Sequence, residues 1–251
     1  MIRKIGVLCV LSLTITAAFA QDGQNGLSFT MKTGITYANM YGPDVKSETF
    51  LNGSTPETFY ANHPASNQFK TGVNVGVSAD YHIGRYFSFG LRAGYIQKGA
   101  QINGTQNWDH FSQSYQNVEG DIYWKQDFWT LEIPITLHIP LKRNGFYIQT
   151  GFFKGFLIKS EETGDISISG SDYEYTRDRD ANDTEPGFFI GGGYMYSFKK
   201  THGNLLAEII WSRSIIQSPG SDMIPNPQYY YNQTFSVNLG YRYYFSRKRE
   251  K

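Results

Sequence analysis

The strongest constraint on the fold is a two-residue alternation near the end of the chain. From Thr234 to Phe245 every odd position is apolar or aromatic, and the even positions up to Arg242 are small, polar or charged. A β-strand points successive side chains to opposite faces. The pattern therefore predicts a strand with one apolar face and one polar face.

Seven upstream segments alternate in the same way, and each is long enough for a tilted membrane-spanning strand of about 9–11 residues. The connections between them are alternately long and short, as in bacterial outer-membrane barrels. The sequence thus predicts an all-β fold, an eight-stranded antiparallel up-and-down transmembrane β-barrel with four mobile surface loops. The predicted strands are 27–39, 70–82, 85–98, 127–139, 146–159, 187–198, 205–217 and 231–245, and the long polar loops are 40–69, 99–126, 160–186 and 218–230.

A soluble barrel would also have two-faced strands, so the composition of the faces decides between the two classes. The polar face carries many mid-strand glycines, which weaken an exposed strand but make room inside a narrow barrel. The apolar face ends in aromatic residues at both edges, as expected at the two membrane interfaces. These are Tyr37, Tyr95, Trp129, Phe188 and Trp211 towards the long loops, and Tyr81, Phe87, Phe146, Phe198, Tyr243 and Phe245 towards the short turns.

The beginning of the chain predicts export. Arg3 and Lys4 precede an apolar run over residues 5–16, and Ala18-Phe19-Ala20 is a typical cleavage site. Residues 1–20 are therefore predicted to be a signal peptide and residues 21–251 the barrel domain, with an uncleaved anchor as the alternative. This predicts the outer membrane of a Gram-negative bacterium, with both termini periplasmic. The only cysteine, Cys9, leaves with the signal, so no disulfide or cysteine metal ligand is expected.

Several segments resemble one known family. They are Thr33-Gly34-Ile35-Thr36-Tyr37, the predicted hairpin 72–95, Leu131-Glu132-Ile133-Pro134 and the glycine–aromatic stretch 151–157. Together they resemble the PorT-like outer-membrane β-barrel family, which belongs to the small OmpA/OmpX-like barrels. The resemblance implies the barrel fold and brings no catalytic residues with it.

Strand phase places six charged side chains in the lumen, three basic and three acidic. Buried charges are tolerated when they are paired, so a neutral network is expected. Such a network could be a gate for a narrow ion path, but the small lumen favours a polar plug that fixes strand register. Pro134 lacks a backbone donor and predicts a bulge or a break in pairing. The six residues are Lys32, Asp80, Arg92, Glu132, Glu208 and Arg242.

Two further cations, Lys154 and Arg213, fall on the apolar face near the predicted outer interface. A cation there can reach lipid phosphate instead of lying in hydrocarbon. We therefore expect contacts with lipopolysaccharide phosphates. A β-bulge that turns both side chains inward is the alternative.

The long loops are the remaining candidate sites. The acidic loop 160–186 contains a predicted hairpin over 166–175, and its Asp178, Asp180, Asn182 and Asp183 resemble the start of a calcium loop. Asp183 and Phe189 replace the glycine and glutamate that such a loop requires, so a solvated acidic tip is favoured. The loop 99–126 could bind a glycan or a protein by aromatic stacking, or fold onto the barrel mouth. Its aromatic residues are Trp108, Phe111, Tyr115, Tyr123 and Trp124.

Catalysis has little support, because the histidines are dispersed along the predicted barrel and only Asp109-His110 forms an adjacent pair. We predict no enzyme activity, no cofactor and no metal. The expected role is structural or interactive, in envelope integrity, surface attachment or partnership with an envelope or secretion machine. The alternatives are a narrow solute or ion channel and a lipid-modifying enzyme. Expected partners are outer-membrane lipid and lipopolysaccharide, the barrel assembly machinery through the last strand, and an envelope protein or glycan at the loops. The near-neutral charge gives no reason to expect nucleic acid.

Overall fold

The computed structural model describes residues 26–109, 111–141, 144–198, 203–215, 218–219 and 229–245. The predicted signal peptide, the turn residues 142–143 and 199–202, and most of the loop 218–230 lie outside this part. No helix in the described part is long and apolar enough to cross a membrane. The 3-10 turn η2 (Pro56–Thr58) accompanies the strands β1 (Gly26–Tyr41), β2 (Glu48–Asn52), β3 (Tyr60–Ala61), β4 (Lys70–Ile83), β5 (Phe87–Asp109), β6 (Ser114–Pro140), β7 (Asn144–Ile168), β8 (Ser171–Asp178), β9 (Thr184–Ser197), β10 (Gly203–Ser214), β11 (Ser218–Pro219) and β12 (Tyr229–Tyr244).

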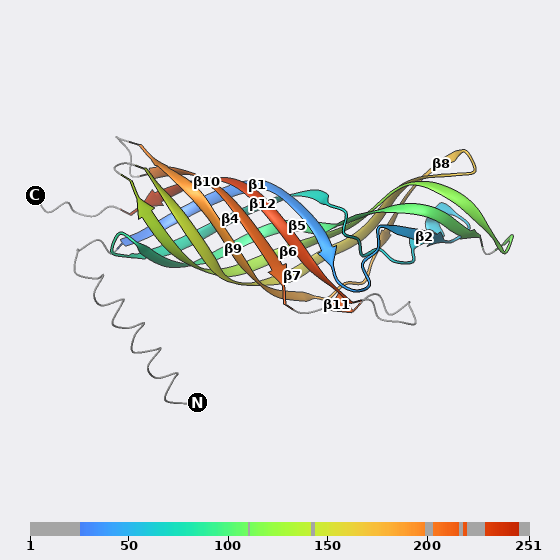
Figure 1. Ribbon diagram of the computed structural model, residues 1–251, viewed down its shortest axis with the longest axis horizontal. Helices are drawn as coiled ribbons and strands as arrows, with labels where there is room; N and C mark the ends of the chain where they lie inside the picture. Colours follow the sequence, from blue (N-terminus) through green and yellow to red (C-terminus); the bar gives the residue numbers. More distant parts are fainter. Residues whose placement is uncertain are drawn as a thin grey trace, which may run out of the picture.

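Eight strands form a closed antiparallel ring in the order β1, β4, β5, β6, β7, β9, β10, β12 (Figure 1). The last strand pairs with β10 on one side and with β1 on the other, with Ile35 opposite Val237 in the second ladder. Closure removes the open edges that would otherwise expose backbone donors and acceptors. The predicted eight-stranded barrel is therefore confirmed.

The outer face of the ring is apolar over its middle and aromatic towards both ends. Side chains such as Ile133, 60% exposed, form the apolar band. Tyr95 packs edge-on against Trp129 at one end, where β5, β6 and β7 leave the ring, and Phe146 packs against Tyr194 at the other end, near the short turns. An apolar band with aromatic edges is the outer surface that a lipid bilayer requires.

The longest strands continue well past the ring, which corrects the prediction of mobile loops at 99–126 and, as far as Asp178, at 160–186. There β5, β6 and β7 remain paired, β2 joins β5 in parallel and β8 joins β7. We call this part, residues 42–69, 99–126 and 159–183, the extension (Figure 1). Its inner face buries an apolar cluster of Leu51, Phe59, Ala61, Ile102, Val118, Ile122, Ile166, Ile168 and Tyr175. The burial of these side chains explains why the segments form strands although their exposed positions are polar.

The predicted hairpin at 166–175 is confirmed as the turn between β7 and β8. Ser169 and Gly170 occupy its two central positions with φ of 53° and 84°. Two consecutive residues with positive φ are typical of the tight turns that match the twist of a hairpin.

Three local irregularities change the ladders around β6, and one of them lies in the extension, between Gly104 and Gln106 of β5. Ile158 has no partner in β6, because Asp127 faces Lys159 while Phe128 faces Leu157. This extra residue is a β-bulge. Because of it, the side chains of β7 that point inward have odd numbers in the ring and even numbers above it. At Pro134 the pairing of β5 with β6 is interrupted without a register change, so the break in pairing that the proline predicted is present and a bulge is not.

Glycines on the inner face provide space for two large polar side chains. A Cβ atom at Gly90 would lie 2.3 Å from Oδ1 of Asp80, and one at Gly193 would lie 2.5 Å from the ring of Tyr147. Neither position could carry a side chain without displacing these groups. The predicted role of the inner glycines in making room is visible at both positions.

Candidate functional site

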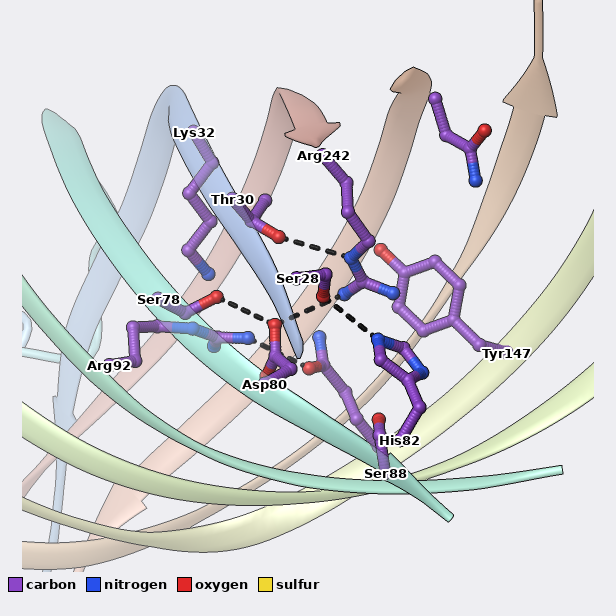
Figure 2. A network of polar contacts seen from close by, with 12 residues as sticks. Ser28, Thr30, Lys32, Ser78, Asp80, His82, Ser88, Arg92, Tyr147 and Arg242 are labelled. Atoms are coloured by element: carbon purple, nitrogen blue, oxygen red, sulfur yellow. Dashed lines mark hydrogen bonds and ion pairs between the residues drawn. The ribbon is translucent and has the colours of Figure 1, made fainter. Parts of the chain in front are cut away.

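All six predicted lumen charges point into the barrel, and they form three ion pairs. The distances are 2.7 Å between Lys32 Nζ and Glu208 Oε1, 2.7 Å between Arg92 Nη1 and Glu132 Oε2, and 3.5 Å between Arg242 Nη2 and Asp80 Oδ2. Figure 2 shows Arg242 and Asp80 facing each other across the lumen, with Thr30 and Ser78 bonded to them. Each pair joins two different strands.

Glu208 is the centre of this network. Besides Lys32 it accepts hydrogen bonds from Tyr147 Oη at 2.9 Å, Gln149 Nε2 at 2.8 Å and Asn238 Nδ2 at 3.0 Å. These donors come from β1, β7 and β12, so one carboxylate on β10 connects four strands. Arg92 also donates to Gln149 Oε1 at 2.9 Å, which links the Arg92–Glu132 pair to the same centre. Because every charge is compensated inside, the network can be buried.

A fourth pair was missed from sequence. Lys98 Nζ lies 3.0 Å from Glu185 Oε1 and 4.5 Å from the ring centre of Phe153, and Asn232 Nδ2 donates to Glu185 Oε2 at 3.1 Å. Lys98 has the same strand phase as Arg92, and that signal was available. The sequence does not predict the pair, because the predicted strand ends at Lys98 and Glu185 falls in the predicted loop 160–186.

Little open space remains in the lumen. A cavity of about 40 Å³ lies between the Lys32 and Arg92 side chains and the ring of Phe189. One water needs about 10–15 Å³, so this space holds about three waters. Towards the extension the barrel mouth is covered by a buried apolar cluster of Met40, Ala65, Ala100, Trp124 and Tyr230. Trp124 donates from Nε1 to Ser160 Oγ at 2.9 Å, which fixes the cluster to β7.

Two histidines meet at the opposite end of the lumen, an arrangement that the apparent dispersion of histidines did not predict. The ring centres of His82 and His138 are 5.3 Å apart. Nε2 of His82 lies 2.8 Å from Ser28 Oγ, as Figure 2 shows, and Nε2 of His138 lies 2.9 Å from Ser88 Oγ. All four side chains are buried and none lines the lumen cavity. His110 of the predicted pair Asp109-His110 lies outside the described residues.

Lys154 and Arg213 both face outward, so the alternative in which a bulge turns them inward is wrong. The bulge in β7 lies at Ile158, beyond Lys154. The Arg213 guanidinium lies 4.8 Å and 5.1 Å from the ring centres of Tyr41 and Tyr231, and Lys154 Nζ lies 5.4 Å from that of Phe156. Both cations therefore lie among aromatic rings on the outer face of the ring.

Two residues of the candidate calcium loop, Asp178 and Asp183, belong to or bond with neighbouring strands. Asp178 ends β8, and the carbonyl of Asp183 accepts a hydrogen bond from the amide of Leu157. Within the described ranges, no group of three or more His, Cys, Asp or Glu side chains is placed to hold a metal ion.

A buried carboxylate fixes the inner side of the extension. Glu162 is fully buried and accepts hydrogen bonds from the amide of Ala61 and from Tyr175 Oη, both at 2.7 Å. Its other oxygen lies 2.8 Å from Arg179 Nε. Burial, together with the charge of Glu162, raises the pKa of Tyr175 well above its usual range, so the phenol stays a donor. The network holds β3 against β7 and β8.

The turn between β5 and β6 is held by a second carboxylate, that of Asp109. It accepts hydrogen bonds from Ser112 Oγ at 2.7 Å, the amide of Phe111 at 2.9 Å and Ser54 Oγ at 2.8 Å. These bonds lower the pKa of Asp109 to about 2. Of the aromatic residues predicted in this region, Trp124 folds onto the barrel mouth, whereas Phe111 and Tyr115 are exposed at the far end. Folding onto the barrel mouth is therefore observed for Trp124, and binding of a glycan or protein by the exposed rings stays a prediction.

Comparison with known proteins supplies a family. The family model described as outer membrane protein beta-barrel domain matches residues 19–218. No characterised protein matches the sequence at a significant level.

Solved structures with a similar fold include several outer-membrane barrels. Neisserial surface protein A is 12% identical, with 88% of this chain and 99% of that chain covered and a TM-score of 0.41. OprG from Pseudomonas aeruginosa is 10% identical, with 90% and 99% covered and a TM-score of 0.44. The outer membrane protease OmpT from Escherichia coli is 12% identical, with 90% and 98% covered and a TM-score of 0.34. Identities this low carry no functional assignment.

Proposed function

The chain belongs to the family of outer membrane protein beta-barrel domains, and we propose that it serves in the outer membrane as an interaction barrel. In this role the ring is the anchor and the extension is the working part. The observation that carries the proposal is the folded state of the extension, which has its own apolar cluster and its own buried carboxylate network. Such a structure presents a fixed surface, whereas mobile loops would lose conformational entropy on binding.

The contents of the lumen support an anchor over a channel. Four ion pairs and the mouth cluster occupy much of it, and two cavities among these groups measure about 40 Å³ and about 10 Å³, which is space for a few waters. We expect no conductance for the wild-type protein in planar bilayers. Arg92→Ala or Glu132→Ala should lower thermal stability and still open no pore, because the other pairs stay in place. Large single-channel currents would instead support the narrow channel.

Among the described residues, the buried Ser–His contacts are the structural argument for the lipid-modifying enzyme. Both contacts lie inside the barrel wall and away from the cavity, where neither a lipid nor a peptide could reach them. A mass shift of lipid A after deletion of the gene would favour this enzyme.

The proposed role includes an orientation and a lipid environment. The extension faces the cell exterior and both termini face the periplasm, where the last strand meets the barrel assembly machinery. Arg213, held between two tyrosines, and Lys154 contact lipopolysaccharide phosphates. Loss of co-purified lipopolysaccharide from the doubly substituted protein Lys154→Ala/Arg213→Ala would support these contacts, and unchanged lipid would contradict them. Within the family, the PorT-like motifs fit an association with an envelope machine.

Removing the extension tests the proposal directly. Gln101 faces Tyr123 across β5 and β6, and Glu161 faces Asp178 across β7 and β8. Joining each pair by a two-residue Asn-Gly turn, and replacing 42–68 by a short linker, should leave a barrel that still inserts and resists denaturation by detergent. We expect cells with this variant to lose surface attachment and in-cell cross-links to partners. Full attachment and unchanged cross-links would refute the proposed function.

A further inference from the structure

The far end of the extension presents unusually exposed aromatic rings. Phe111 is 86% exposed and Tyr115 is 61% exposed. Trp108 lies below them, with its ring centre 4.8 Å from that of Tyr115. Phe111 lies in the turn that joins β5 to β6, and Trp108 and Tyr115 face each other at the ends of these two strands. We call the three side chains the aromatic tip.

The turn that carries the aromatic tip is braced from two sides. Asp109 holds the amide of Phe111 and the hydroxyl of Ser112 within the turn, and it reaches across to Ser54 on the β2–η2 connection. The neighbouring amide of Gly53 donates to the carbonyl of Trp108. Holding an apolar ring in solvent by such a network does not stabilise the fold. Presentation of this kind lowers the entropy lost when a partner binds.

The strands and connections that lead to the aromatic tip are acidic. The stretches 48–61 and 103–121 contain no lysine or arginine and five acidic residues, Glu48, Glu57, Asp109, Glu119 and Asp121. Over the whole extension, fourteen Asp and Glu residues face five Lys and Arg residues. A negative field of this size attracts cations and repels phosphate, sulfate and nucleic acid.

Aromatic faces in a negative field are suited to bind guanidinium and ammonium groups by cation–π contact. The extension already uses this contact internally, where Arg177 lies 5.0 Å from the ring centre of Tyr60. We propose that the aromatic tip is a docking surface for an Arg/Lys-rich polypeptide segment of a partner protein. The proposal rests on the interaction role assigned above and names the chemistry of its partner.

The inference can be tested with defined probes on the purified mature chain in dodecyl maltoside. Hexa-arginine, hexa-glutamate and heparin are titrated by biolayer interferometry at low and high salt. We expect hexa-arginine to bind, its affinity to fall with salt, and the other two probes not to bind. Phe111→Ala should weaken hexa-arginine binding about 2- to 5-fold, and Phe111→Ala with Tyr115→Ala about 5- to 30-fold.

Two matched controls separate cation–π docking from other causes. Phe111→Leu keeps apolar bulk and removes the ring, so it should bind as weakly as Phe111→Ala. Asp180→Asn with Asp183→Asn removes two charges near the base of the extension, and it should weaken binding less than Glu57→Gln with Glu119→Gln. Wild-type affinity in Phe111→Leu, equal effects of the two charge pairs, or preferential binding of heparin would each overturn the inference.

The outcome for the docking surface is distinct from the outcome for the interaction role. If hexa-arginine does not bind but removal of the extension still abolishes attachment, the interaction role stands and the docking inference is wrong. If removal of the extension changes nothing in cells, the interaction role itself fails.

Discussion

Three long strands, β5, β6 and β7, run through both the ring and the extension, and the polarity of their two faces is reversed between the two parts. In β6 the inner face of the ring carries Thr136 and Glu132 and the outer face carries Ile133. Above the ring, on the same strand, the inner face carries Ile122 and the outer face carries Glu119. The side chains of β6 keep their alternation through this inversion, so a change in the phase of this strand does not cause it.

The inversion shows that the surrounding solvent sets the pattern of side chains. Hydrocarbon surrounds the ring, so apolar residues face out and polar residues pair inside. Water surrounds the extension, so the apolar residues turn inward as in any soluble sheet. At the boundary β6 passes within two residues from Trp129, in the aromatic edge, to Asp127, which pairs with Lys125 at 3.3 Å.

The largest expected effects come from removing one carboxylate from each part. Glu208→Ala leaves Lys32 and three polar donors in the lumen without their acceptor. Breaking a buried pair in this way costs about 3–5 kcal/mol, so the heat-induced unfolding of the barrel on gels should move to lower temperature. Glu162→Ala should have a similar cost, confined to the extension, and be detected as faster proteolysis of residues 42–69 and 159–183.

The pair of substitutions also tests whether the two parts are separate folding units. If Glu162→Ala lowers the unfolding temperature of the barrel as much as Glu208→Ala does, the parts unfold together. The ring and the extension would then not be separate folding units. Glu208→Gln keeps the size and part of the hydrogen bonding, and it should fall between Glu208→Ala and the wild type.

A lysine should have different costs at two positions on the outer face of β6. Ile133→Lys places an ammonium group in hydrocarbon and should destabilise the barrel by about 2–4 kcal/mol. Glu119→Lys lies in water and should change stability by less than about 0.5 kcal/mol. Equilibrium unfolding in lipid vesicles measures both. Equal effects would show that hydrocarbon does not contact Ile133.

A smaller effect is expected from a single hydroxyl in the extension. Tyr175→Phe removes the hydrogen bond to Glu162 at 2.7 Å and leaves the ring in place. Hydrogen bonds to charged groups contribute about 1.5–3 kcal/mol, and this loss should appear in hydrogen exchange of β8. Thr176→Val, on the same strand, is the control, and an equal increase in exchange would argue against the bond.

The smallest expected effect is a loss of stability of the β5–β6 turn at low pH. The hydrogen bonds from Ser112, Phe111 and Ser54 lower the pKa of Asp109 from 3.8 to about 2. Because the folded-state pKa is the lower one, the contribution of Asp109 to the stability of the turn is complete above pH 4 and is lost as the pH falls to about 2. The carboxyl carbon shift of Asp109 should titrate near pH 2. Asp109→Asn should remove this pH dependence of the turn, and a midpoint near the ordinary value would contradict the bracing of the aromatic tip.

The ring could be predicted from sequence because alternation, aromatic edges and inner glycines are properties of single strands. The six lumen charges follow from the same phase. The extension could not be predicted in this way, because its polar outer face looks like a loop until the partner strands β2 and β8 are known. The polarity of the two faces also reverses within a single strand. A prediction that assigns one polarity to each face of a strand therefore fails there.

Pairing across the sequence limited the predictions of the site. His82 and His138 are far apart in the chain, and their contact depends on the stagger of β4, β5 and β6. The bulge at Ile158 shifts the phase of β7 by one residue, so Glu162 could not be assigned to the inner face by extending the pattern from Tyr147. Such a shift has no clear signature in the residues themselves.

The passage of β5 and β6 from the ring to the aromatic tip, with β7 paired to β6 as far as Val118, has a mechanical consequence. Ladder hydrogen bonds lie across the strand direction, so tension applied at the tip loads the whole row in shear at once. A tether built this way should resist flow and detachment forces far better than a flexible linker of the same length. Under pulling by an atomic force cantilever, we expect the attachment to the partner to rupture before the strands separate.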